Sequence, residues 1–232
     1  MNVVITGATK GIGLAIANTF AGAGYHIITC SRNENDLKRL QQDLHKRFGI
    51  SVKYKVADIG NESEIKAFGN WIVNEELNAD VLVNNAGCFV PGAVYNEDDG
   101  ILQKMMETNV YGSYHLIRLL LPGMIGRKNG HIFNICSVAS FHAFANVGAY
   151  GISKFALLGL TRHLREELKP FGIKVTAVSP GATFTASWEG SNVDPRRIID
   201  ANDVAKMIFA ASQLSPSTVV EDIILRPQLG DL

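Results

Sequence analysis

Few features of this sequence point to metal binding or to a disulfide-bonded fold. The 232 residues include only three cysteines, Cys30, Cys88 and Cys136, which lie far apart and fit no zinc-ligand spacing. We interpret them as reduced thiols, two of them at the ends of apolar strands. The sequence therefore predicts no metal site.

The chain also lacks an excess of charge of either sign and lacks long hydrophobic runs. Its 22 lysines and arginines balance its 22 aspartates and glutamates, which argues against a surface for nucleic acid or for an anionic membrane. The longest apolar runs fall well short of a membrane span, and the N-terminus enters a strand pattern without a basic leader. We expect a cytoplasmic protein without nucleic-acid or membrane partners.

Strand and helix patterns alternate regularly along the chain, without repeats or a linker. At 232 residues and 47% hydrophobic content, one sizeable core is possible. Such alternation predicts parallel pairing, right-handed crossovers and helices on both faces of a sheet. We predict a single α/β domain over 1–232, a Rossmann-type doubly wound sheet of about seven mainly parallel strands. Strands are expected near 2–6, 26–30, 51–56, 80–83, 131–136, 173–178 and 219–225, and helices near 11–22, 34–48, 61–76, 98–125, 149–168 and 201–212.

A glycine-rich turn follows the first strand directly. It reads Gly7-Ala8-Thr9-Lys10-Gly11-Ile12-Gly13 and runs into a helical pattern. Strand, glycine turn and helix are the context in which a dinucleotide pyrophosphate binds, because glycine lets the backbone approach closely and the helix N-terminus offers free N–H groups. The spacing is Gly-x-x-x-Gly-x-Gly, which differs from the standard Gly-x-Gly-x-x-Gly.

Tyr150 and Lys154 form a pair suited to carbonyl chemistry. Residues four apart on a helix share a face, so the ammonium of Lys154 is expected beside the phenol of Tyr150. A nearby cation favours the phenolate and lowers a pKa that starts near ~10, which makes Tyr150 a general acid. Ser137 precedes them after an apolar run. The alternative is that Tyr-x-x-x-Lys is only a packed tyrosine and a solvated lysine, since short motifs also match by accident.

These motifs occur together with Asn84-Asn85-Ala86-Gly87 and Asn109, in the order that characterises one enzyme family. From residue 2 to about residue 227 the chain resembles the short-chain dehydrogenase/reductase family. The resemblance implies an Asn109, Ser137, Tyr150 and Lys154 tetrad. It also implies cofactor contacts from Gly7, Thr9, Lys10, Gly11, Ile12, Gly13, Asp58, Asn85, Ala86, Gly87, Tyr150, Lys154, Pro180, Gly181, Thr183 and Thr185.

The roles within the tetrad follow from where charge develops when hydride reaches a substrate carbonyl. The Ser137 hydroxyl would bind the carbonyl oxygen and Tyr150 would protonate it. Lys154 would lower the Tyr150 pKa and hold the ribose of the nicotinamide. By family analogy, Asn109 would hold a water that passes protons to Lys154; alternatively, it is a polar residue that interrupts a long helix. For Asp58 the alternative role is a helix N-cap.

Charge around the second strand predicts which nicotinamide cofactor is used. NAD readers place an acidic residue at the end of this strand, whereas a 2′-phosphate requires cations. Here Arg32 is the first charged residue after the strand, with no acid before Glu34, and Lys10 lies in the glycine turn. This combination resembles the NADP-preferring branch of the family, so we expect NADPH.

The substrate is predicted from the last third of the chain. Residues 182–200 have the character of a mobile substrate lid, in which Trp188 either stacks on a planar substrate or anchors the lid. The pattern around Pro180 and Trp188, together with the ending Gly230-Asp231-Leu232, is similar to bacterial sepiapterin reductases. This similarity implies a pterin side-chain ketone or a related small dicarbonyl, with Asp231 binding the pterin edge. Alternatively, Asp231 belongs to a frayed terminus.

Two other functions remain open. A 3-oxoacyl-carrier-protein reductase would share the tetrad and would dock its acidic partner on cations such as Arg127, Lys128 and Lys169. An NADPH-binding sensor without activity is the non-enzyme alternative, although it would not need Ser137 or Tyr150. Apolar residues on more than one face of the helices near 98–125 and 149–168 also predict a homodimer or homotetramer, as in the family.

Overall fold

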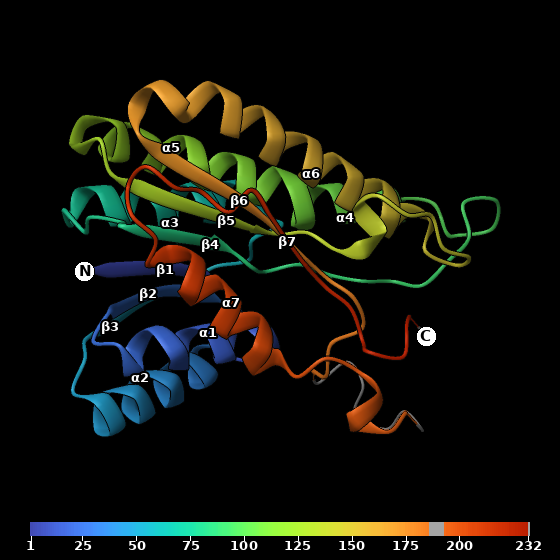
Figure 1. The fold of residues 1–232 in the computed structure, drawn as a ribbon, viewed down its shortest axis with the longest axis horizontal. Helices are drawn as coiled ribbons and strands as arrows, with labels where there is room; N and C mark the ends of the chain where they lie inside the picture. The colour runs from blue at the N-terminus through green and yellow to red at the C-terminus, as the bar shows by residue number, and fades with distance from the viewer. Residues whose placement is uncertain (186–192, 232) are drawn as a thin grey trace.

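One parallel sheet organises the molecule (Figure 1). The computed structural model describes residues 1–185 and 193–231. In this part of the chain the strand order is β3-β2-β1-β4-β5-β6-β7, and each neighbouring pair is parallel. The strands are β1 (Asn2–Thr6), β2 (His26–Ser31), β3 (Val52–Val56), β4 (Val81–Asn84), β5 (Gly130–Ile135), β6 (Ile173–Pro180) and β7 (Asp222–Leu225).

Helices cover both faces of this sheet. In Figure 1, α1, α2 and α7 lie on one face and α3, α5 and α6 on the other. The larger elements are α1 (Gly11–Gly22), α2 (Glu34–Phe48), α3 (Glu62–Asn74), α4 (Ile101–Met106), η1 (Glu107–Tyr111), α5 (Gly112–Arg127), α6 (Gly148–Leu168) and α7 (Ala201–Ser212). The short 3-10 turns are η2 (Val138–Ser140), η3 (Lys169–Phe171) and η5 (Pro195–Arg197).

Two apolar layers hold the helices to the sheet. Successive side chains of a strand point to opposite faces. Thus Val3 and Ile5 of β1 pack with Phe20 and the other residues of the α1, α2 and α7 layer, whereas Val4 packs with Phe68 in the α3, α5 and α6 layer. Because both faces are buried, the strands read as nearly continuous apolar runs.

Helix ends explain where the connections begin. Asn33 caps α2 by accepting the Asp36 N–H at 3.1 Å, and Gly49 ends that helix in the left-handed conformation with φ +69°. Asn61 caps α3 through the N–H groups of Ser63 and Glu64. Asp58 is therefore not the N-cap of α3, which was the alternative role expected for it.

The predicted fold class is confirmed, with differences at two elements. The single helix expected near 98–125 is instead α4, the π-helical segment η1 and α5. The strand expected over 219–225 begins only at Asp222, which pairs with Ala177. Before it, the Val220 carbonyl accepts a bond from the Thr176 side chain. No helix in the described residues is long and apolar enough to cross a membrane.

Candidate active site

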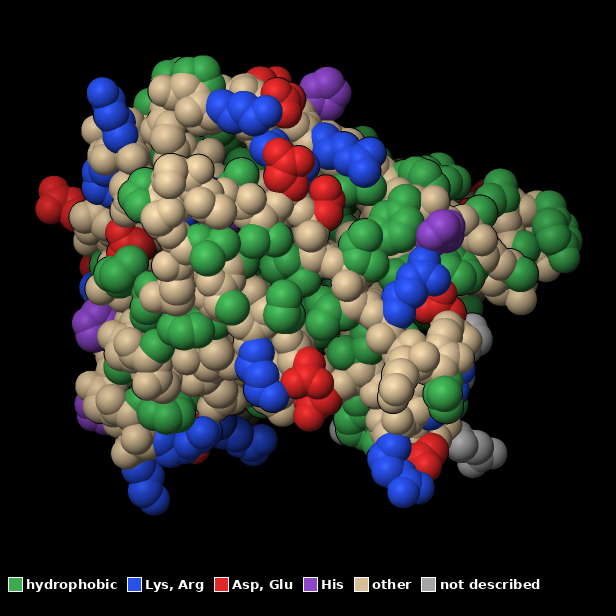
Figure 2. All heavy atoms as spheres, viewed as in Figure 1, with side chains coloured by type: hydrophobic (Ala, Val, Ile, Leu, Met, Phe, Trp, Pro, Cys, Tyr) green, Lys and Arg blue, Asp and Glu red, His purple; other side chains and the backbone are tan. Residues whose placement is uncertain are grey.

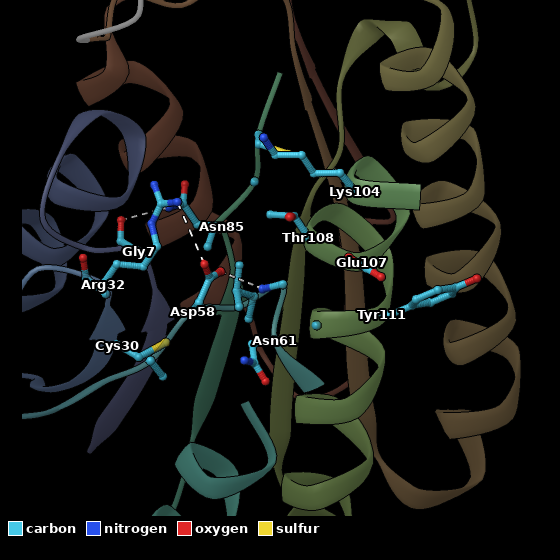
Figure 3. A pocket seen from close by; sticks show the side chains of 18 of the residues that line it. Gly7, Cys30, Arg32, Asp58, Asn61, Asn85, Lys104, Glu107, Thr108 and Tyr111 are labelled. Carbon is cyan, nitrogen blue, oxygen red and sulfur yellow. Dashed lines mark hydrogen bonds and ion pairs between the residues drawn. The ribbon is translucent and has the colours of Figure 1, made fainter. Parts of the chain in front are cut away.

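A cavity of about 920 Å³ opens at the carboxyl ends of β1, β2 and β4 (Figure 3). Ligands of open α/β sheets bind at this edge. Ten of the residues predicted to contact the cofactor line it: Gly7, Lys10, Gly11, Ile12, Arg32, Asp58, Asn85, Ala86, Gly87 and Thr185. The cavity therefore lies where the dinucleotide is expected to bind.

The glycine turn is held tightly against the end of β4. Gly7 has φ +69°, a conformation that favours glycine. A Cβ at Gly13 would lie 2.2 Å from the Gly7 carbonyl oxygen and 2.5 Å from Asn85 Nδ2, so neither position tolerates a side chain. This close packing leaves the start of α1 facing the cavity, as pyrophosphate binding requires.

Thr6 and Asn85 join the turn to β4. The Thr6 hydroxyl accepts the backbone N–H groups of Asn85 and Ala86, each at 3.0 Å, and the Asn85 amide donates to the carbonyls of Thr6 and Gly7. Asn85 thus lines the cavity while it fixes the glycine turn. Thr6 supports the site from beneath, a role that we did not assign from the sequence.

Two exposed cations stand at the rim of the cavity. Lys10 Nζ lies 3.5 Å from Asp36 Oδ2, and Arg32 Nη1 lies 3.9 Å from Asp58 Oδ2 (Figure 3). Both pairs are largely open to solvent and are weak on that account. A phosphate placed between Lys10 and Arg32 would replace long carboxylate contacts with charge-assisted bonds.

Tyr150 and Lys154 lie on the first turns of α6. The Lys154 ammonium is 5.7 Å from the centre of the Tyr150 ring and donates to the Ile135 carbonyl at 2.8 Å. Lys154 is buried, with 5% of its surface exposed, whereas Tyr150 is only partly buried. The expected shared helix face is therefore present. The Ile135 carbonyl fixes the lysine at the end of β5.

Asn109 lies in the π-helical segment and joins three parts of the site. Its amide donates to Ser153 Oγ at 2.9 Å and to the Cys88 carbonyl at 3.1 Å, and its oxygen accepts the Cys88 N–H at 2.8 Å. A Cβ at Gly87 would lie 2.9 Å from Asn109 Oδ1 and 3.6 Å from Lys154 Nζ. Asn109 does interrupt the long helix, and it also lies next to Lys154.

Ser137 stands at the carboxyl end of β5 as the cap of η2. Its oxygen accepts the Ala139 N–H at 3.1 Å, while its own N–H donates to Ser140 Oγ. Accepting a bond leaves the hydroxyl proton able to donate to a substrate oxygen. The Ala139 carbonyl lies 3.9 Å from the Cβ position of Gly151, so η2 packs beside the turn that carries Tyr150.

The remaining predicted contacts lie outside the cavity lining. Thr9 Oγ1 is 3.5 Å from Ser31 Oγ. Pro180 ends β6, and Thr183 donates to the carbonyl of Gly181 at 2.9 Å. The Asp231 carboxylate pairs with Arg226 and lies 3.2 Å from the Cβ position of Gly181. Trp188 lies outside the described residues.

The stem of the predicted lid is paired. The Phe184 N–H donates to the Ile199 carbonyl at 2.8 Å, and the Ile199 N–H donates to Ala182 at 2.9 Å. Arg197, in η5, donates to the carbonyls of Leu229 and Gly230. The segment over 193–200 is thus attached to the C-terminal residues beside β7.

Comparison with known proteins identifies this arrangement. The model of the short chain dehydrogenase family matches residues 1–195. The chain belongs to the short-chain dehydrogenase family. Sepiapterin reductase from Chlorobaculum tepidum is 33% identical to it over 238 residues, covering 99% of this chain and 97% of that protein. As a family member, the chain is an oxidoreductase.

Solved family structures share the fold over nearly the whole chain. A metagenomic short-chain oxidoreductase in complex with NADP has a TM-score of 0.85 at 28% identity, covering 98% of this chain and 97% of its own. L-sorbose reductase from Gluconobacter frateurii, complexed with NADPH and L-sorbose, has a TM-score of 0.90 at 26% identity, covering 97% and 95%.

Several cavity residues were not predicted from the sequence. Ser31 could have been predicted as a cavity residue, because it stands beside Arg32 at the end of β2. Thr108, Glu107 and Tyr111 could not, because they lie in the π-helical segment η1, which the apolar pattern does not reveal; Figure 3 labels all three. The remainder are Cys30, Ala57, Ile59, Gly60, Asn61, Glu62, Cys88, Lys104, Gly112 and His115.

Proposed function

We propose that this protein is an NADPH-dependent reductase of a small ketone or dicarbonyl. The observation that carries the proposal is that Asn109 and Lys154 lie close to Gly87, which lines the cavity, with Tyr150 one helical turn before Lys154. The family relatives solved with NADP or NADPH support the choice of cofactor.

The cavity residues fit a phosphorylated dinucleotide. Gly7 and Gly11 line the cavity with backbone that can approach a pyrophosphate closely, and Gly13 allows the tight packing of the turn against Asn85. Lys10 and Arg32 offer two cations at the rim for a 2′-phosphate. When bound, NADPH supplies a hydride to the substrate carbonyl carbon.

Residues of the protein would bind and protonate the oxygen of that carbonyl. We propose that Ser137 donates a hydrogen bond to the oxygen and that Tyr150 transfers a proton to it. Lys154, held by its bond to the Ile135 carbonyl, has its Nζ 5.7 Å from the centre of the Tyr150 ring. Asn109 holds the Cys88 and Ser153 sides of the site together, which positions the backbone around Lys154.

For the substrate, we propose a pterin side-chain ketone or a related small dicarbonyl. The sepiapterin reductase relative supports this proposal over almost the whole chain. Asp231 is the proposed partner of the pterin edge. One of its oxygens pairs with Arg226, and the other is buried without a hydrogen-bond partner among the described residues. A buried carboxylate oxygen without a partner is costly, and paired N–H donors on a ligand would satisfy it.

The cations that a carrier-protein reductase would use for docking do not lie beside the cavity. Lys128 ends α5 shortly before β5, and Lys169 begins η3 shortly before β6, so both lie near the amino ends of the strands and away from the cavity. Arg127 donates to Asn78 and Ala79, and Lys169 pairs with Glu166. Their positions support the small-carbonyl proposal over the carrier-protein alternative.

A panel of carbonyl substrates followed by NADPH absorbance tests the proposal. We expect turnover of sepiapterin and small diketones, with acetoacetyl thioesters turned over more slowly. Preference for the thioesters would favour the carrier-protein reductase. The absence of NADPH oxidation even in a single turnover would favour the sensor and contradict the proposed activity.

A further inference from the structure

Two loops project side by side beyond the carboxyl edge of the sheet (Figure 1). The first, over 88–100, follows β4, and the second, over 141–147, leads into α6. Gly92 and Val147 form an isolated parallel bridge, and the Gly92 N–H donates to the Asn146 carbonyl at 3.0 Å. The Gly148 N–H donates in turn to Gly92 at 2.8 Å. The first loop is therefore attached to the start of α6.

The first turn of α6 has no cap from its own sequence. Val147 stands at the N-cap position and has no side-chain oxygen. Instead, Glu97 Oε2 accepts the Ala149 N–H at 3.1 Å from the other loop. Capping satisfies an N–H group that the helix leaves free, and a carboxylate is favoured at the positive end of the helix dipole. Glu97 thus caps α6 although it lies far from that helix in the sequence.

Contacts around this bond are too close to allow much movement. A Cβ at Gly148 would lie 2.8 Å from the Val94 nitrogen and 3.2 Å from Glu97 Oε2. The ring of Phe89, at the start of the same loop, packs edge-on against the Tyr150 ring with 4.9 Å between centroids. The loop therefore contacts the first turn of α6 through the backbone, through a carboxylate and through an aromatic ring.

From this arrangement we infer that Glu97 is a positioning residue for Tyr150. The inference rests on the proposed role of Tyr150 as proton donor. Ala149, which Glu97 holds, is the residue immediately before Tyr150, so the bond fixes the helical turn from which the phenol projects. Helix ends fray when their N–H groups lose partners, and small misplacements of a reacting group reduce the rate steeply.

Three variants separate positioning from general support of the fold. Glu97→Ala removes the acceptor, Glu97→Gln keeps an acceptor oxygen, and Asp99→Ala removes an exposed carboxylate from the same loop. With sepiapterin or a small diketone and NADPH, we expect Glu97→Ala to lower kcat roughly tenfold or more while the NADPH Kd stays unchanged. Glu97→Gln should recover most of kcat, and Asp99→Ala should match the wild type. Gly148→Ala should resemble Glu97→Ala, because its methyl group would displace the loop.

The outcomes distinguish this inference from the proposed function. Wild-type kcat in Glu97→Ala, alongside an inactive Tyr150→Phe, would overturn the positioning role alone. An active Tyr150→Phe would overturn the proposed function and the inference with it. Equal losses of Tm, NADPH binding and kcat in both Glu97 variants would also overturn positioning, because they would mean that Glu97 only stabilises the fold.

Discussion

At the scale of single residues, the Tyr150 hydroxyl has the most sharply testable role. Tyr150→Phe keeps the ring that packs against Phe89 and removes only the hydroxyl. We predict that kcat falls by ~10²-fold or more, because proton donation is lost as the alkoxide forms, while NADPH binding is almost unchanged. Steady-state kinetics and a fluorescence titration with NADPH measure the two effects. More than about a tenth of the wild-type kcat would exclude the role.

Lys154→Ala is the matched comparison for that variant. Lys154 Nζ lies near Gly87, which lines the proposed cofactor cavity, so its loss should weaken NADPH binding as well as lower the rate. An unchanged NADPH Kd would show that Lys154 does not contact the cofactor. The two variants together separate proton transfer from cofactor binding.

A substitution of Asp231 tests the proposed pterin substrate. We predict that Asp231→Asn raises KM for sepiapterin several-fold and leaves a small diketone, which has no guanidine-like edge, almost unaffected. Arg226→Met is the control, because it breaks the same ion pair without removing the carboxylate. Equal losses on both substrates, reproduced by Arg226→Met, would mean that Asp231 supports the C-terminal segment. No loss on either would remove Asp231 from the site.

His131 makes stability depend on pH. It is buried, its Nε2 lies 2.8 Å from Thr176 Oγ1 and its ring stacks on Phe133. Burial, and to a lesser extent the charge of Lys174, lowers its pKa to about 3 from the usual 6.5. As the pH falls, His131 is therefore protonated in the unfolded chain before it is protonated in the folded protein. The contribution of neutral His131 to the free energy of unfolding is complete above about pH 6.5. It is lost at about 1.4 kcal/mol per pH unit as pH falls toward 3.

Urea unfolding above and below about pH 6.5 checks this dependence. The wild type should lose more stability on acidification than His131→Asn. His115→Asn, which alters a partly exposed histidine near Glu62, should behave as the wild type does. Identical pH slopes for all three proteins would show that His131 does not contribute to acid sensitivity.

The sequence reveals the residues of the site better than it reveals their contacts. Tyr150 and Lys154 are recognisable because four residues bring side chains to one helix face, a local rule of geometry. The bond between Asn109 and Ser153 joins residues on two different elements, and no spacing rule predicts it. Glu97 is hidden for the same reason, since its partner Ala149 lies far along the chain.

At the scale of elements, apolar periodicity predicts regular segments and misses features that depend on contacts with distant parts of the chain. Apolar periodicity locates the strands and main helices because burial is regular along each of them. It treats α4, η1 and α5 as one helix, because a π-helical turn inserts its extra residue without breaking the apolar pattern. The shortened start of β7 also escapes it, because the bond from the Thr176 side chain to the Val220 carbonyl does not show in the apolar pattern.

Arg165 fastens α6 to the beginning of β7. Its buried guanidinium donates to the carbonyls of Val175 and Glu221 and lies 3.2 Å from the Glu221 carboxylate. We predict that Arg165→Met lowers the free energy of unfolding by roughly 2–4 kcal/mol, because it removes the guanidinium that joins α6 to β7 and leaves the buried Val175 carbonyl without its side-chain donor. Arg162→Met, on the exposed face of α6, should change it by less than about 0.5 kcal/mol. Urea midpoints measure both, and equal effects would contradict the anchoring role.

At the scale of the whole molecule, the carboxyl edge of the sheet brings the two halves of the site together. The glycine turn after β1, the Asn85 segment after β4 and the Ser137 turn after β5 come from distant parts of the chain. Parallel pairing places all of them at one edge. The fold class was predictable for this reason, and so was the location of the site within it.

The outer surface of α5 and α6 carries the last prediction; Figure 2 shows hydrophobic side chains among the charged ones on this view of the molecule. Tyr111 of η1, Tyr114 of α5, and Ile152 and Phe155 of α6 are all more than a third exposed, which is unusual for large apolar side chains on neighbouring helices. We predict a homodimer or homotetramer that buries them, with a mass by light scattering of two or four times 25.2 kDa at micromolar concentration. Tyr114→Glu should shift this mass toward the monomer. Val73→Glu, an equally apolar and exposed site on α3, should leave the mass unchanged, and a strictly monomeric wild type would contradict the assembly.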